Sequence, residues 1–396
     1  MKNLEQILSV ALSVPMDDPT SPRCRWGLPL MLEGSPGIGK SGRVQGTAAC
    51  VGLETSVVYP ATRQPEDFSG APIPDGKGGV SIECILPAVR TMVKLGRGVI
   101  FVDEITCARP AVQGALLGFI YERVCGDTVL PGTVRILAAG NPAGEAAGGW
   151  NLAPPMANRL AWLDVRKPNA REWSQWLLSG PEKLEASPDA EDRVKSGWAR
   201  SWAKMQGLGA AFIQANPDIL YNLPEEGKPE RHRAWPSPRT WEFALRAVAT
   251  CHALGKSELQ FDFVKACVGE AAATEWAAWI TDRDLPDPEE MLTNGWTADK
   301  SRLDVTVAAL SSLAAFVKSY PVGAKRNTFA ANAWEILAAT AQAGMADAIV
   351  VPSGILLQAG FRAIGEQGDV IDPKVRKAAL PALTKVQKLG ITKAVS

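Results

Sequence analysis

The chain has 396 residues, which is long enough for two or three domains with a sizeable hydrophobic core. Its 42 basic and 42 acidic side chains cancel, so it carries no global positive field to attract nucleic acid. No apolar run is long enough to span a membrane and the N-terminus lacks a signal-peptide pattern, so we expect a soluble cytoplasmic protein.

The cysteines and histidines exclude two further classes of site. Seven cysteines are scattered along the chain without a C-x-x-C pair, and only two histidines are present. This distribution predicts free thiols in a reducing compartment, with no disulfide and no zinc site.

Residues 1–27 are expected to form an N-terminal apron beside the following domain. Apolar residues recur at helical spacing from Leu4 to Leu12, before a turn rich in proline and aspartate.

Residues 34–41 match the phosphate-binding pattern G-x-x-x-x-G-K-[ST] and follow an apolar run over residues 28–32. Glycines let the loop backbone direct several N–H groups at a nucleotide's phosphates, Lys40 adds a positive charge, and the Ser41 hydroxyl suits Mg²⁺. A helix ending at Gly52 is expected to follow. We therefore predict an ATP and Mg²⁺ site. Its loop residues are Gly34, Ser35, Pro36, Gly37, Ile38, Gly39, Lys40 and Ser41.

The next segments alternate between strand, turn and helix patterns. Residues 55–59 form a β-branched run typical of a strand, and residues 62–70 are expected to break regular structure. A hairpin is predicted around residues 75–79, and a helix from Leu86 to Gly96.

Two acids follow a strand that is expected to be buried on both faces. Residues 99–102 are all apolar, and Asp103 and Glu104 come directly after them. This is a Walker B pattern, in which Asp103 would hold Mg²⁺ and Glu104 would activate the attacking water. A simple helix cap is the alternative.

The remaining strands complete a parallel α/β domain over residues 28–168. A helix is predicted at 110–122, a second hairpin at 123–133, and buried strands at 135–140 and 161–165. Asn141 ends the first of these strands, where its amide could contact a γ-phosphate or the hydrolytic water. Alternating strands and helices predict a five-stranded, doubly wound parallel sheet with helices on both faces.

From residue 169 onward the pattern is helical. We expect an all-α lid over residues 169–256, with a helix that Ser237 and Pro238 open, and a helical C-terminal extension over 257–396. The helices predicted in this extension cover 259–282, 301–319, 324–343, 353–366 and 373–389.

Taken together, these motifs resemble the AAA+ ATPases, in particular the MoxR-like branch with a helix-2 insert. The resemblance implies that Asn141 is sensor 1, Arg159 the arginine finger that acts in trans, and Arg239 sensor 2. Two departures exist: Thr106-Cys107 where the family usually has Asn-Arg, and Asn158-Arg159-Leu160 where it usually has Asp-Arg-Phe. Arg166 and Arg135 remain alternative fingers.

The family resemblance further implies a ring, typically a hexamer, whose two hairpins near residues 71–84 and 123–134 face a pore or a client. MoxR-like proteins are similar in role to chaperones that remodel a protein partner, often one with a von Willebrand A domain. Two alternatives stay open: a nucleic-acid-acting AAA+ motor or loader, and an ATP-gated regulatory ring with slow turnover. The zero net charge and the weakly basic hairpins disfavour nucleic acid.

Overall fold

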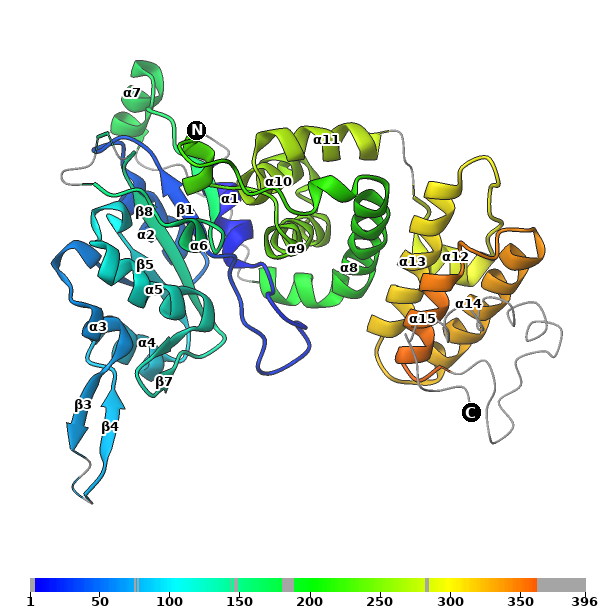
Figure 1. Cartoon of the computed structure of the whole chain (residues 1–396), viewed down its shortest axis with the longest axis horizontal. Coiled ribbons are helices and arrows are strands. Elements are labelled where there is room, and N and C mark those ends of the chain that lie inside the picture. Colours follow the sequence, from blue (N-terminus) through cyan, green and yellow to red (C-terminus); the bar gives the residue numbers. More distant parts are fainter. Residues whose placement is uncertain are drawn as a thin grey trace. The chain divides into compact units, whose positions relative to one another are not determined.

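The computed structural model describes residues 4–74, 76, 78–142, 144–145, 149–179, 189–281 and 285–361 (Figure 1). Contacts divide the chain into two units. The sheet unit contains residues 1–195 and 220–274, and the helical unit contains residues 196–219 and 275–396.

The sheet unit is built on five parallel strands, as the sequence predicts, and their order in the sheet is β2-β5-β8-β1-β9. The strands are β1 (Leu30–Glu33), β2 (Thr55–Val58), β5 (Gly98–Val102), β8 (Val134–Gly140) and β9 (Ala161–Asp164). Every residue of β5 and β8 is buried, which explains their continuous apolar sequences.

Strand register brings the polar ends of three strands to one edge of the sheet. Glu33, the last residue of β1, pairs with Gly140 of β8, and Val102 of β5 pairs with Ala138. The residues that follow these strands therefore meet at the same edge, where parallel α/β sheets bind ligands.

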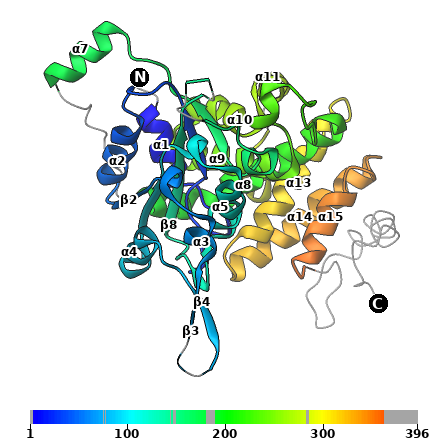
Figure 2. The same ribbon diagram turned by 60° about the vertical axis from the view of Figure 1, so that its left-hand side comes forward.

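Helices lie on both faces of the sheet (Figures 1 and 2). Helix α1 (Leu4–Leu12) precedes the first strand, and those between the strands are α2 (Lys40–Cys50), α3 (Pro65–Ser69), α4 (Pro87–Leu95), α5 (Pro110–Glu122) and α6 (Pro154–Ala157). Helices α2 and α4 pack against β2 and β5, whereas α5 contributes Leu116 and Phe119 to the main hydrophobic cluster. The fold class predicted from the sequence is thus confirmed.

The segment over residues 62–70 is more regular than predicted. It contains the short helix α3, whose first turn is closed by a capping box between Gln64 and Asp67. The helix is too short to show the helical repeat of apolar residues, so the sequence pattern does not reveal it.

Both predicted hairpins are present, and they are joined to each other. Strands β3 (Ala71–Pro74) and β4 (Val80–Glu83) form a hairpin that extends away from the sheet (Figure 2), and β6 (Val124–Cys125) and β7 (Thr128–Val129) form the second. The Asp127 carboxylate accepts from the Ile82 N–H at 2.9 Å, and the Asp127 N–H donates to the Ile82 carbonyl at 2.7 Å.

A disulfide between Cys84 and Cys125 adds a covalent link between the two hairpins, with their Cα atoms 5.2 Å apart. The prediction that all seven cysteines are free thiols is therefore wrong. The two residues are 41 positions apart, and only the tertiary approach of the hairpins brings them together, which sequence spacing does not reveal.

Further helices of the sheet unit are α7 (Ala170–Ser179), α9 (Pro238–Leu254) and α10 (Gln260–Val268). The Ser237 side chain accepts from the Thr240 N–H at the start of α9, as the sequence predicts. The helix predicted over 259–282 is instead divided by Gly269, whose φ of 84° ends α10 before α11 (Glu270–Thr281) begins.

The helical unit contains the last part of α8 (Ala190–Ala215), the end of α11, and α12 (Pro288–Asn294), α13 (Leu303–Ser319), α14 (Ala324–Gln342) and α15 (Val350–Gln358). Gly207 allows α8 and α13 to approach closely, because a Cβ there would lie 2.5 Å from the Ala308 carbonyl oxygen. The helix predicted over 353–366 begins earlier, as α15, and the one over 373–389 lies outside the described residues.

Across the described ranges, no helix is both long and apolar enough to cross a lipid bilayer.

The disulfide predicts a specific thiol count. Titration of the denatured, non-reduced protein with a thiol reagent should give five thiols per chain, because two of the seven cysteines are joined. Cys84→Ser should raise the count to six by releasing Cys125, whereas the control Cys50→Ser, which removes an exposed free thiol, should lower it to four. Seven thiols in the wild type would contradict the assignment.

Candidate nucleotide-binding site

The loop after β1 has the backbone conformation that its glycines permit. Gly37 and Gly39 have φ values of 76° and 86°, which side-chain-bearing residues rarely adopt, and a Cβ at either would meet no atom within 4 Å. Gly34 is needed for a different reason, since a Cβ there would lie 2.6 Å from the Val165 carbonyl oxygen. The loop thus leaves open space at its two positive-φ positions.

Lys40 lies at the centre of the site, with only 8% of its surface exposed. Its Nζ donates to the carbonyl oxygens of Gly34 at 2.6 Å and Ser35 at 3.0 Å, and to Oδ1 of Asn141 at 2.8 Å. Burial lowers the pKa of Lys40, and the acids Asp103 and Glu104 act in the opposite direction. The predicted phosphate loop and the predicted sensor-1 residue are therefore joined through one ammonium group.

Ser41 and Asp103 form the neighbouring contact. The Ser41 hydroxyl donates to Oδ2 of Asp103 at 2.6 Å, and Oδ1 of the same carboxylate accepts from the Glu104 N–H at 3.0 Å. Two hard oxygen ligands side by side suit Mg²⁺, which is usually held by one or two protein groups together with phosphate oxygens and water. The part of the chain that the structure describes contains no cluster of three or more histidine, cysteine or acidic side chains that could hold a metal instead.

Glu104 occupies a left-handed conformation, with φ 55° and ψ 37°. Such a conformation costs a non-glycine residue about 1–2 kcal/mol and is often found at functional sites. Glu104 is the second residue after the buried β5, and its side chain is exposed at the sheet edge. The adjacent acids of the Walker B pattern therefore differ in environment, since Asp103 is 7% exposed.

Thr106, one of the two departures from the family pattern, positions the Asn141 backbone. Its hydroxyl accepts from the Asn141 N–H at 3.2 Å, and its carbonyl oxygen accepts from the Trp150 N–H at 2.7 Å. A Cβ on Gly140 would lie 2.8 Å from the Thr106 side chain, so the two residues pack closely. In the sequence, Thr106 is apparent only as a departure from the family pattern, and no role in the site is predicted for it.

The predicted finger Arg159 and sensor-2 Arg239 lie together on the ring of Tyr121. Their Cζ atoms are 5.5 and 4.7 Å from the ring centroid. Burial and the neighbouring Arg239 lower the pKa of Arg159, and the other charged groups acting on it are Tyr121 and Glu122. Neither acid of the Walker B pattern is among these groups.

Asn158, the second departure, joins the two arginine motifs. Its Oδ1 accepts from the Ser237 hydroxyl at 3.0 Å, and its Nδ2 contacts the Trp235 carbonyl oxygen at 3.5 Å. An aspartate could accept the first of these bonds but, when ionised, could not donate the second. The asparagine therefore suits a position where one side chain contacts both a hydroxyl and a carbonyl.

The alternative fingers have other partners. Arg135 is 1% exposed, donates to the Leu12 carbonyl oxygen at 3.1 Å and forms an ion pair with Glu191, so it is a structural group. Arg166 is exposed and forms an ion pair with Glu172 at the start of α7.

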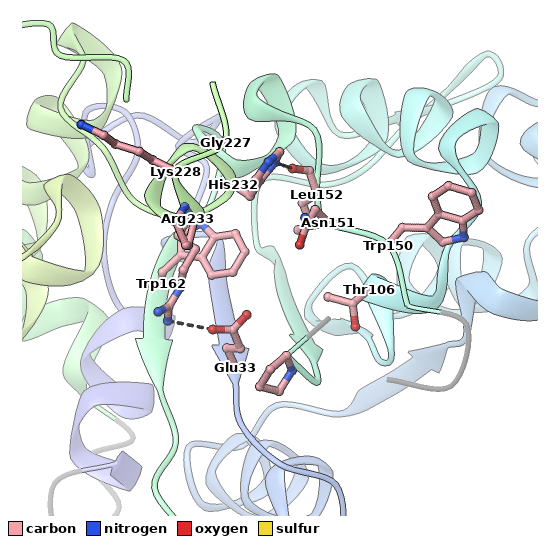
Figure 3. A pocket seen from close by; sticks show the side chains of 12 residues that line it. Glu33, Thr106, Trp150, Asn151, Leu152, Trp162, Gly227, Lys228, His232 and Arg233 are labelled. Atoms are coloured by element: carbon pink, nitrogen blue, oxygen red, sulfur yellow. Dashed lines mark hydrogen bonds and ion pairs between the residues drawn. The ribbon is translucent and has the colours of Figure 1, made fainter. Parts of the chain in front are cut away.

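A pocket of about 460 Å³ lies beside the site, lined by residues that include Glu33, Thr106, Trp162, His232 and Arg233 (Figure 3). Arg233 forms ion pairs with Glu33 at 2.8 Å and with Asp164, so it links the ends of β1 and β9. Burial raises the pKa of Glu33, and Arg233 opposes this shift. The residue that precedes Gly34 is thereby fixed to the adjacent strand.

The parallel sheet and the phosphate loop at its edge define a P-loop NTPase fold of the AAA+ class. Residues 29–160 match the family model described as AAA domain, dynein-related subfamily.

Among solved structures, the chain is similar to a protein from Cytophaga hutchinsonii described as a putative ATPase, with 16% identity and a TM-score of 0.42 over 67% of this chain and 80% of that one. No curated protein matches the chain.

Lys40→Ala should weaken ATP binding, because it removes the cation at the centre of the loop. Charge-assisted hydrogen bonds contribute about 1.5–3 kcal/mol, so the affinity should fall roughly 10- to 100-fold in a calorimetric titration. The control Lys94→Ala removes an exposed lysine at the end of α4 and should leave the affinity unchanged. Equal affinity for wild type and Lys40→Ala would refute the assignment of the phosphate loop.

Proposed function

We propose that the chain is a Mg²⁺-dependent ATP hydrolase that assembles into a ring, of hexameric size by family resemblance, and remodels a protein partner in the manner of MoxR-type chaperones. The observation that carries the proposal is the cluster of Lys40, Ser41, Asp103 and Asn141. Lys40 donates to Asn141 and Ser41 donates to Asp103, and the four side chains come from the segments that follow β1, β5 and β8. The AAA domain match over residues 29–160 supports the nucleotide chemistry.

Each residue of the cluster has a role in this proposal. The N–H groups of the loop and Lys40 would bind the phosphates, and Ser41 and Asp103 would hold Mg²⁺, which neutralises phosphate charge when bound. Glu104 would accept the proton of the attacking water, since its exposed carboxylate lies next to Asp103. Asn141 would orient the γ-phosphate or that water, exchanging its bond to Lys40 for one to the ligand.

The proposal of a ring depends on the arginines. Arg159 and Arg239 lie on Tyr121, and no ion pair joins either to a carboxylate within the described residues. An arginine finger that is directed away from its own site can complete the site of a neighbouring subunit. ATP hydrolysis would then depend on assembly.

The hairpins favour a protein client over nucleic acid. Val80 of β4 and Val129 of β7 are 64% and 67% exposed. Arg123, a basic residue at the start of the second hairpin, donates to the carbonyl oxygens of Val134 and Trp26, and burial lowers its pKa to about 10. Arg123 is thus not available to phosphates, whereas the exposed valines could contact a protein. By the family resemblance, a protein with a von Willebrand A domain is a candidate for this client.

Glu104→Gln should retain ATP binding but lose hydrolysis, because Ser41 and Asp103 are unchanged while the proton acceptor is removed. General-base catalysis is worth about 10²–10⁴-fold, so the ATPase rate should fall at least about 100-fold. The control Glu335→Gln, on the exposed face of α14, should turn over normally. If Glu104→Gln hydrolyses ATP at nearly the wild-type rate, the general base is another residue. If the wild-type protein itself hydrolyses ATP as slowly as Glu104→Gln, the regulatory ring is favoured.

Mixing two inactive variants tests the shared site. Arg159→Ala should bind ATP normally yet hydrolyse it more slowly, by a factor on the order of 10³–10⁵ if the finger resembles those measured in other NTPases. Mixed with Lys40→Ala, it should regain activity, because an intact loop of one subunit can meet an intact finger of the next.

The measurement is the ATPase rate across mixing ratios, with subunit exchange verified. A rate above both parents supports the shared site. A flat rate would contradict Arg159 as the trans-acting residue and direct attention to Arg166.

A further inference from the structure

Tyr121 is the common contact of two arginines that are 80 residues apart in the sequence. It lies in the last turn of α5, whereas Arg159 follows α6 and Arg239 lies in the first turn of α9. The guanidinium carbons of Arg159 and Arg239 are 5.5 and 4.7 Å from the centroid of its ring. Both are within the range in which a cation is attracted to an aromatic face.

The arrangement places two like charges together, and Glu122 is the acid that partly offsets the charge of Arg159. Within the described residues, neither guanidinium forms an ion pair, and Arg239 is the charged neighbour that most strongly lowers the pKa of Arg159. Repulsion between them has to be offset, and the electron-rich ring can do this for both, because arginine stacks on aromatic faces with little loss of hydration.

Most donors of this pair are not used within the described residues. Arg159 donates through Nη1 to the Pro155 carbonyl oxygen at 2.9 Å, whereas Arg239 donates no hydrogen bond to a described residue and meets the ring of Tyr121. A guanidinium group has five N–H donors, so the site is suited to a ligand that accepts hydrogen bonds. Two guanidinium groups side by side suit an oxyanion with several oxygens, such as a phosphate.

The backbone around the pair is fixed independently of Tyr121. Asn158 and Ser237, the residues beside the two arginine motifs, are hydrogen-bonded at 3.0 Å, and both are buried. The segments that carry the arginines therefore remain adjacent if the ring is removed. Only the directions of the two long side chains depend on it.

We propose that Tyr121 is a positioning residue that holds Arg159 and Arg239 as one unit for the terminal phosphate of a nucleotide bound to the neighbouring subunit. This inference rests on the proposed function. It adds that the two arginines act at one phosphate, and that an aromatic ring at this position accelerates hydrolysis by holding them there.

The inference predicts different effects for three substitutions. Tyr121→Phe should retain hydrolysis, because the ring provides the attraction and the hydroxyl forms no hydrogen bond within the described part of the chain. Tyr121→Leu and Tyr121→Ala should lower kcat roughly tenfold, as expected for the loss of two cation–aromatic contacts. ATP affinity should be unchanged in all three, because Lys40 and its partners are untouched. Tyr59→Leu, an exposed tyrosine after β2, is the matched control.

Mixing separates positioning from general damage to the fold. Tyr121→Leu mixed with Lys40→Ala should recover activity, since the Lys40→Ala subunit supplies a correctly held arginine pair to the intact loop of its neighbour. A variant that has merely lost stability would not recover in this way, and Tyr121→Leu retains apolar volume to limit such damage.

Three results would overturn the inference. These are a Tyr121→Phe rate as low as that of Tyr121→Leu, reduced ATP affinity in Tyr121→Leu, or absence of recovery in a mixture where Arg159→Ala does recover. If Arg159→Ala itself fails to recover, the shared site of the proposed function falls and this inference falls with it.

Discussion

The burial of the Lys40 ammonium group is the constraint on which the rest of the site depends. A buried cation is costly unless polar groups surround it, and here the oxygens of Gly34, Ser35 and Asn141 accept its hydrogen bonds. Asn141 can reach Lys40 only because β8 lies beside β1 in the sheet. The strand order thus determines which side chains meet the phosphate loop, and β5, on the other side of β8, adds Asp103.

A second centre lies on Tyr121, where Arg159 and Arg239 gather. Helix α5 connects the two, because it begins at Pro110, shortly after Glu104, and ends one residue after Tyr121. The chain therefore has an anion site formed by loop N–H groups and Lys40 near the start of α5, and a pair of arginines near the end of the same helix. This division is what a catalytic site shared between identical subunits requires, and it supports the proposal of a ring.

Much of the sheet unit could be predicted from the sequence, and the reasons for the failures are physical. Buried strands such as Val99 to Val102 are continuous apolar runs, and the phosphate loop and the Ser237 cap have local signatures. The disulfide between Cys84 and Cys125, the left-handed Glu104, and the bond between Asn158 and Ser237 depend on tertiary contacts instead. In the sequence, Asn158 is a departure from the arginine-finger motif of the family. In the structure, its amide accepts from the Ser237 hydroxyl and contacts the Trp235 carbonyl oxygen.

Dependence of catalysis on assembly can be measured directly as the ATPase rate per subunit at different protein concentrations. If a neighbouring subunit completes the site, we expect a low rate per subunit in dilute protein, a rise as subunits associate, and a plateau once association is complete. A rate per subunit that stays constant down to concentrations at which the chain is monomeric would contradict this dependence, because a single chain would then complete its own site.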